Sequence, residues 1–134
     1  MTVEEAVRAL GVAIQADERF QKYMEVSKLA GEDQESLMLR EKLQDLQEAF
    51  NVETQKETPD EAKIQQMQEQ YQEMYQKLFQ IPAVVAAMDQ REVMDKMMNN
   101  VMQIIYLTMN GEDPLTCQPS EETMQAMQQG LMNM

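Results

Sequence analysis

Hydrophobic residues recur at helical spacing along most of the chain. The first set is separated by steps of 4, 3 and 4 residues and predicts an amphipathic helix at the N-terminus: Val3, Val7, Leu10 and Ile14. Asp17 predicts an N-cap or a kink, after which the apolar residues continue on a second helical face, and Gly31 predicts where that run ends. Asp33 is suited to cap the next helix, in which the 4, 3, 4 spacing returns at Leu39, Leu43, Leu46 and Phe50.

A glutamine-rich segment, "IQQMQEQYQEMYQKLF" at residues 64–79, carries the next apolar line. Its steps of 3, 4, 3 and 4 are typical of a helix packed lengthwise on another, at Ile64, Met67, Tyr71, Met74 and Leu78. This line can be core, a partner surface or the wall of a cofactor site. "TPDE" at 58–61 predicts the helix start, with Thr58 as N-cap and Pro59 in the first turn. A short link between two helices of similar length predicts an antiparallel hairpin.

Pro82 predicts the start of a last long helix that ends at Asn110 and Gly111. Its apolar residues cover an arc of roughly 180°, against about 100° for a helix buried on one side. So wide a face predicts a homodimer or higher oligomer, with an interface that includes Met94, Met98, Val101 and Ile105. The predicted fold is therefore all-α and bundle-like, with four to five helices around a central hairpin. Residues 1–110 form a single helical domain and residues 111–134 an acidic tail, in which Ser120 can cap a short helix.

The charge balance excludes several classes of partner. The chain has 24 acidic and 11 basic side chains, a net charge of −13, concentrated in residues 31–62 and 111–134. Nucleic-acid affinity depends on Lys and Arg that neutralise phosphates. We therefore expect no direct binding to nucleic acid or to an anionic membrane.

The remaining composition indicates a soluble cytoplasmic protein. No basic leader opens the chain, and the longest stretch without charge is fifteen residues, which is too short to span a bilayer. The chain contains fifteen methionines. Methionines fill adaptable cores, or when exposed suit surfaces that accept varied partners.

Residues that carry catalysis are missing or isolated. The chain has no histidine, which removes His-dependent triads and His-ligated zinc, and its four glycines form no phosphate-binding loop. Paired carboxylates such as Glu4 and Glu5 are expected to be solvated charges. We predict no enzyme, no catalytic residue, no metal and no cofactor site.

The order of these motifs resembles the YlbF/YmcA family of small helical bacterial proteins. "AVRALGVAIQADERFQKYMEVSKLAGED" is similar to the family's opening, with Phe20 and Tyr23 three residues apart before the acidic break at Glu32 and Asp33. "LFQIPAVVAAMDQREVMDKMMNNVMQII" resembles its closing segment. The resemblance implies a regulatory protein, linked to competence, sporulation and biofilm control, that acts in a multiprotein complex on messenger-RNA processing by RNase Y. Iron–sulfur clusters are associated with that complex, and here a cluster forms only if other chains supply ligands beside Cys117, the single thiol.

Three classes of function remain open at this point. The leading one is a regulatory adaptor that binds itself and other regulatory proteins through helical faces. The alternative is a holdase-type chaperone whose Met-rich helical surface grips unfolded clients. A coiled-coil spacer is less favoured because Gly31, Pro59 and Pro82 interrupt the apolar lines.

Overall fold

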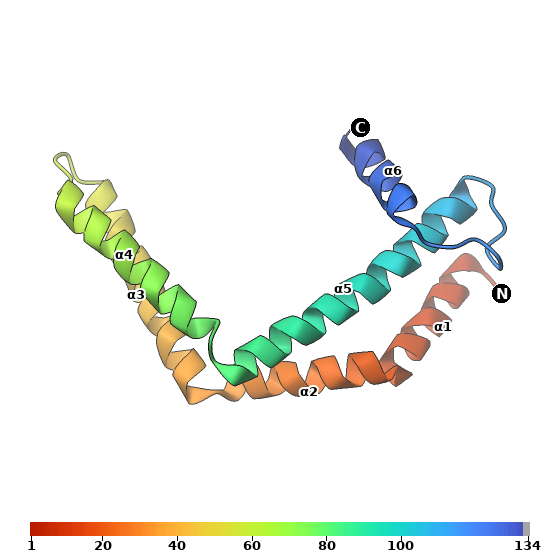
Figure 1. The fold of residues 1–134 in the computed structure, drawn as a ribbon, viewed down its shortest axis with the longest axis horizontal. Coiled ribbons are helices and arrows are strands. Elements are labelled where there is room, and N and C mark those ends of the chain that lie inside the picture. Colours follow the sequence, from red (N-terminus) through yellow and green to blue (C-terminus); the bar gives the residue numbers. More distant parts are fainter. Residues whose placement is uncertain (133–134) are drawn as a thin grey trace. The chain divides into compact units, whose positions relative to one another are not determined.

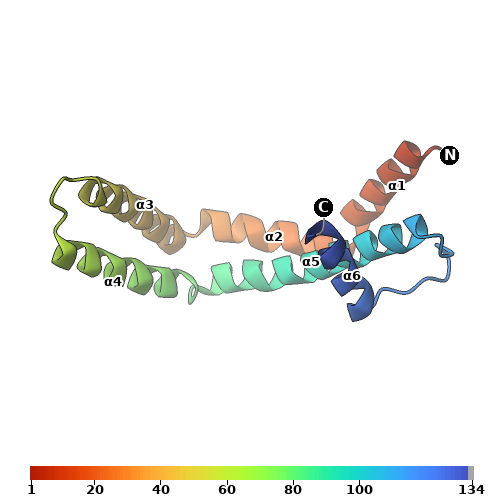
Figure 2. The same ribbon diagram turned by 90° about the horizontal axis from the view of Figure 1, so that it is seen from above.

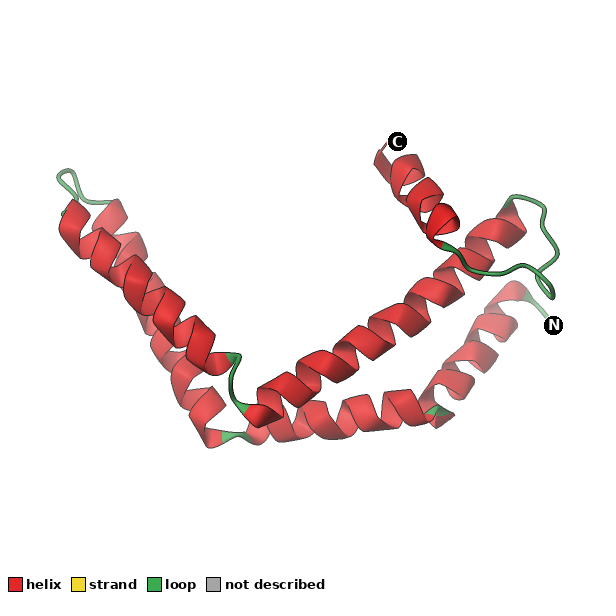
Figure 3. Cartoon of the chain, in the orientation of Figure 1, coloured by secondary structure: helices red, strands yellow, loops and turns green. Residues whose placement is uncertain are grey.

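Helices make up most of the part of the chain that the structure describes. The structure, a computed structural model, describes residues 1–132, in which there are six helices and no strand (Figures 1 and 3). Their bounds are α1 Val3–Ala16, α2 Glu18–Glu32, α3 Gln34–Thr54, α4 Glu61–Leu78, α5 Pro82–Met109 and α6 Glu121–Met132. The predicted all-α class is confirmed. The number of helices exceeds the predicted four to five because the short helix in the tail, α6, also forms.

Capping side chains explain where the first helices begin. Thr2 and Glu5 form a capping box at the start of α1, each side chain bonding the other residue's backbone N–H. Asp17 ends α1 in an extended conformation and caps α2, its carboxylate accepting from the Arg19 N–H at 2.8 Å. Asp33 caps α3 in the same way by accepting from the Ser36 N–H at 2.8 Å. The predicted roles of Asp17 and Asp33 are confirmed.

Gly31 was predicted to end the second helical run, but α2 does not end there. The helix runs on through Glu32, and Asp33 breaks it with an extended backbone at φ −66° and ψ 122°. A glycine that ends a helix does so in the left-handed region, and Gly31 does not enter it. The break is therefore set by the side chain that caps the next helix.

The prediction for the start of α4 is also wrong by two residues. Asp60, rather than Thr58, is the N-cap, and its carboxylate accepts from the Lys63 N–H at 3.2 Å. Pro59 accordingly precedes the cap and is not in the first turn. Asp60 is held there because its own N–H donates to the Glu53 carboxylate at the end of α3, at 3.1 Å.

α3 and α4 lie side by side and run antiparallel in both views (Figures 1 and 2). Where the two helices meet the start of α5, the core consists of four buried side chains: Leu43, Leu78, Ile81 and Val84. Partly buried hydrophobic residues pack against this cluster: Leu39, Met74, Phe79 and Ala83. The apolar lines of the two helices thus contribute to one core.

The ends of α5 follow the prediction. Pro82 is its first residue, where a missing N–H costs nothing, and the helix ends at Met109. Gly111, which follows two residues later, has φ +93°. A side chain at this position would be strained, so the turn requires glycine.

The internal contacts divide the chain into two units, residues 1–90 and residues 91–134, with the division inside α5. The first contains α1 to α4 and the opening turns of α5. The second contains the rest of α5 and α6. The predicted organisation, one helical domain over residues 1–110 and a tail over residues 111–134, stays a prediction.

Candidate functional site

A line of exposed hydrophobic residues runs along α5 in the second unit. We call it the α5 stripe, and its members are spaced 4, 3 and 4 residues apart: Met98, Met102, Ile105 and Met109. Their exposed fractions are 40%, 48%, 45% and 82% in that order. Single exposed hydrophobic residues are ordinary on proteins, whereas four on one side of one helix mark a candidate interaction surface.

The structure places the predicted interface residues on the same side of α5. On an ideal helix Met94, Met98, Val101 and Ile105 fall within about 60° of one another. Met98 and Ile105 are exposed, whereas Met94 and Val101 are half-buried. The prediction omitted Met102 and Met109, although their spacing from Met98 and Ile105 was visible in the sequence.

Part of the apolar arc of α5 is buried: Met97, at 7% exposure, belongs to the arc but not to the stripe. Leu107 and Gln103, at 8% and 3% exposure, are also buried, and on an ideal helix they lie outside the arc, on the side away from the stripe. The Gln103 Oε1 atom accepts from the Ser120 N–H at 2.8 Å, which fixes the chain just before α6. Ser120 in turn caps α6 by accepting from the Thr123 N–H at 3.1 Å. The arc that predicted self-association is therefore partly internal.

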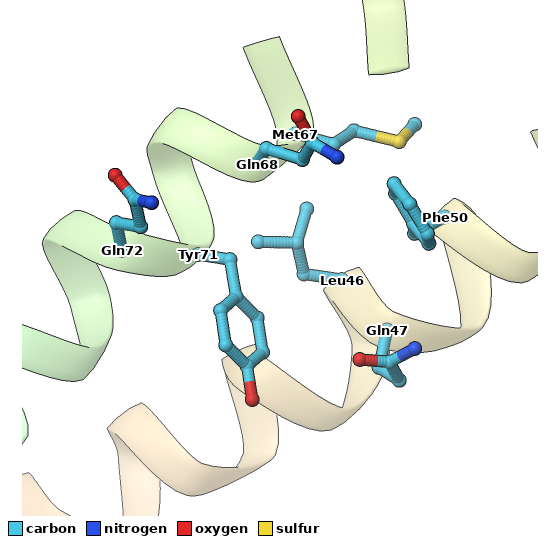
Figure 4. A pocket seen from close by; sticks show the side chains of 7 residues that line it. All are labelled: Leu46, Gln47, Phe50, Met67, Gln68, Tyr71 and Gln72. Atoms are coloured by element: carbon cyan, nitrogen blue, oxygen red, sulfur yellow. The ribbon is translucent and has the colours of Figure 1, made fainter. Parts of the chain in front are cut away.

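A second surface lies between α3 and α4 in the first unit. A groove of about 390 Å³ opens there, within the range of ligand and side-chain pockets. Figure 4 shows Leu46 between the helices, Phe50 and Met67 near one another, and Tyr71 reaching from α4 towards α3. We call this the α3–α4 groove, and its lining consists of Leu46, Gln47, Phe50, Met67, Gln68, Tyr71 and Gln72.

An aromatic ladder continues from the groove along α4. Tyr71 stacks on Tyr75 with ring centroids 5.8 Å apart, and Tyr75 meets Phe79 edge to face at 4.5 Å. Tyr71 and Tyr75 are 36% and 45% exposed. The sequence placed Tyr71 on the packing line of α4, and the structure shows that a face beside this line is also apolar.

A buried carboxylate fixes the far end of the α3–α4 pair. Glu53 is 4% exposed, and its carboxylate lies 2.7 Å from the Lys56 Nζ and 4.0 Å from the Lys63 Nζ. The hydrogen bond from Lys56, together with that from the Asp60 N–H, lowers the pKa of Glu53. The Glu53 carboxylate thus acts as a structural clamp between the end of α3 and the start of α4.

The pKa is also shifted in the ion pair at the start of α2. The Arg19 guanidinium donates to the Asp17 carboxylate at 2.8 and 2.9 Å, and this pair lowers the pKa of Asp17 to about 2. The two residues lie two positions apart at the solvent-exposed start of the helix. Their interaction is local, and neither residue lines the α3–α4 groove.

The described residues offer little for metal or redox chemistry. Within residues 1–132 no group of three or more His, Cys, Asp or Glu side chains is placed to hold a metal ion. Cys117 is half-buried in the segment before α6. An iron–sulfur cluster is held by several thiolates, so this single thiol does not fit one without ligands from other chains. Among the residues described, no helix is long and apolar enough to cross a membrane.

Comparison with known proteins identifies the family. The family described as "Control of competence regulator ComK, YlbF/YmcA" matches residues 3–110, from the first residue of α1 to just past the end of α5. Neither the curated proteins nor the solved structures give a match. Since the match covers most of the chain and agrees with the order of its motifs, the protein belongs to the YlbF/YmcA family.

Proposed function

We propose that the protein is a cytoplasmic, non-enzymatic regulatory adaptor that acts by protein–protein association in the control of competence. The α5 stripe is the observation that carries the proposal, because it exposes four large apolar side chains on one line of a helix. Membership of a family described as controlling the competence regulator ComK supplies the regulatory setting.

In this proposal the chain first associates with itself. The contact includes Met94, Met98, Val101 and Ile105, extended by the other members of the α5 stripe. Burying the exposed part of the stripe contributes about 4–5 kcal/mol per chain, at roughly 2 kcal/mol per fully buried side chain. Two chains together gain about 9 kcal/mol, which is similar to the 4–15 kcal/mol that association costs. We therefore expect a homodimer or higher oligomer that is reversible and depends on concentration.

The regulatory effect then passes through other proteins. With 24 acidic against 11 basic side chains, the surface repels the phosphate backbone. An influence on messenger-RNA processing by RNase Y, which resemblance to the family implies, is accordingly exerted through a bound regulatory protein. The chain contributes no catalytic residue and no cofactor of its own to such a complex.

A pair of double variants tests the proposal. Met98→Asp with Ile105→Asp places charges on the α5 stripe. Met24→Asp with Val12→Asp is the matched control, because these residues are 53% and 70% exposed on α2 and α1. Sedimentation first gives the mass of the wild type. The stripe variant should lose self-association and its co-purifying regulatory partners in the native host, while the control keeps both.

Two results would contradict this assignment. If the wild-type chain sediments as a monomer at tens of micromolar, the proposed self-association is wrong.

The alternative function is a holdase-type chaperone, which is favoured by the exposed methionines of α5. It predicts that the isolated protein stops a model client from aggregating, and this result would contradict the adaptor. Defined partners without such activity support the adaptor.

A further inference from the structure

The α3–α4 groove is apolar inside but open to solvent. Leu46, Phe50 and Met67 are only half-buried, and Tyr71 is 36% exposed. Two helices alone cover each other along one seam and leave both flanks of that seam uncovered. A stable helical layer normally buries such a flank against a further layer. The groove therefore has the chemistry of a surface that another element covers.

The rim of the groove carries amides and no charge. Gln47, Gln68 and Gln72 are exposed, and no acidic or basic side chain lines the groove, although the chain has a net charge of −13. A two-fold symmetric contact places a surface against its own copy. Carboxylates repel one another in such a contact, whereas glutamine has both a donor and an acceptor and can bond to another glutamine.

The aromatic ladder has the same property. Tyr71 belongs both to the groove and to the ladder, so the two surfaces are continuous. Aromatic rings pack well against other aromatic rings, in stacked or edge-to-face geometry. The ladder, like the rim, is therefore compatible with an identical partner.

We propose that the α3–α4 groove docks on the same groove of a second copy of this chain, so that two α3–α4 pairs form a four-helix bundle. This contact is separate from the one proposed for the α5 stripe, which lies in residues 91–134, whereas the groove lies in residues 1–90. A chain with both contacts can assemble beyond a dimer. Either contact can fail without the other.

Salt gives this contact a recognisable signature. Residues 34–78 carry ten acidic and five basic side chains, and three of the five lysines and arginines already lie within 4.0 Å of a glutamate: Lys56, Lys63 and Lys77. Two copies approaching through this region therefore repel each other at long range. Added salt screens the repulsion, so the self-contact strengthens with ionic strength, whereas docking of a basic partner weakens.

Two double variants on the same helix test the proposal. Gln68→Glu with Gln72→Glu puts carboxylates on the rim, where a symmetric contact brings them together. Gln66→Glu with Gln70→Glu is the matched control: it adds the same charges to α4 at the same i, i+4 spacing, with both residues exposed and outside the groove. Each pair is made in the full chain and in the Met98→Asp, Ile105→Asp chain. The second background isolates the groove contact from the α5 stripe.

We expect sedimentation to show that the rim variant weakens self-association at least about tenfold, because like charges facing each other cost several kcal/mol. The control should stay within about twofold of its parent. Mixing the rim variant with Gln68→Lys, Gln72→Lys should restore a mixed dimer. A stripe-substituted chain that remains monomeric in both low and high salt, or a rim variant that behaves like its control, would overturn the proposal. Loss of self-association through the α5 stripe alone does not contradict the proposed groove contact.

Discussion

Leu78 occupies the core shared by α3, α4 and the start of α5, and its replacement by alanine tests where that core lies. Leu78 is 7% exposed and belongs to one buried cluster with Leu43, Ile81 and Val84. Leu78→Ala removes three carbon atoms, a loss of roughly 2.4 kcal/mol at about 0.8 kcal/mol per buried methylene. The cavity left behind adds to this, and such substitutions cost about 2–5 kcal/mol in well-packed cores. Because this cluster is small and can partly collapse, we expect a fall of about 3 kcal/mol.

Leu29→Ala provides the matched control. Leu29 lies in α2 and is 55% exposed, so the same change of side chain removes little buried surface. Substitutions at exposed positions usually change the free energy of unfolding by less than about 0.5 kcal/mol. Urea unfolding followed by far-UV circular dichroism, at one fixed protein concentration, measures both variants against the wild type.

The comparison has two outcomes that would refute this reasoning. If Leu78→Ala lowers the free energy of unfolding by less than about 1 kcal/mol, the residue is not in a packed core. If Leu29→Ala loses as much as Leu78→Ala, the exposed face of α2 is covered in solution. The concentration of protein must be equal throughout, because oligomerisation adds to the apparent stability.

Three further predictions concern the clamp, the tail and nucleic acid. Glu53→Gln should flatten the acid side of the stability profile in urea unfolding: the lowered pKa of Glu53 contributes stability above its ordinary value of 4.5, and this is lost as pH falls through the lowered pKa. A Glu53→Gln variant whose stability falls with acid as steeply as the wild type would contradict this. Gln103→Leu should speed amide hydrogen exchange at Ser120 by about tenfold, because its N–H loses the acceptor at 2.8 Å; an unchanged rate would show that the bond is absent in solution. A gel shift with RNA or DNA at physiological salt should detect no complex, and binding at low micromolar protein that strengthens as salt is lowered would refute the charge argument.

Much of the helical pattern could be predicted because its causes are local. Apolar spacing, an aspartate before the helix or a proline in the first turn acts over a few residues, and the starts of α3 and α5 followed from Asp33 and Pro82. The start of α4 did not follow, because the Asp60 N–H is fixed by Glu53, seven residues earlier at the end of another helix. A contact of this kind cannot be read from the spacing around Asp60.

The candidate surfaces show the same division. The α5 stripe was partly predictable, because residues 3 and 4 apart on a helix share a side whatever the helix touches. Which residues of α5 are buried was not predictable, since the burial of Met97, Gln103 and Leu107 depends on packing that lies outside the spacing pattern. The α3–α4 groove could not be predicted at all. Gln47 and Gln68 line one groove only after α3 and α4 lie side by side.

The glutamines of α4 bear on its association with other chains, which the apolar line of this helix does not reveal. A glutamate at each rim position would be equally helix-forming and more soluble, so helix propensity does not explain the choice. In a chain of net charge −13, uncharged polar positions are where a second copy can make direct contact without carboxylates facing each other at short range. The apolar positions of α4 hold it against α3, and the glutamines beside them leave the groove free to meet its own copy. The charge pattern of this helix thus bears on association, while its hydrophobic pattern accounts for the fold.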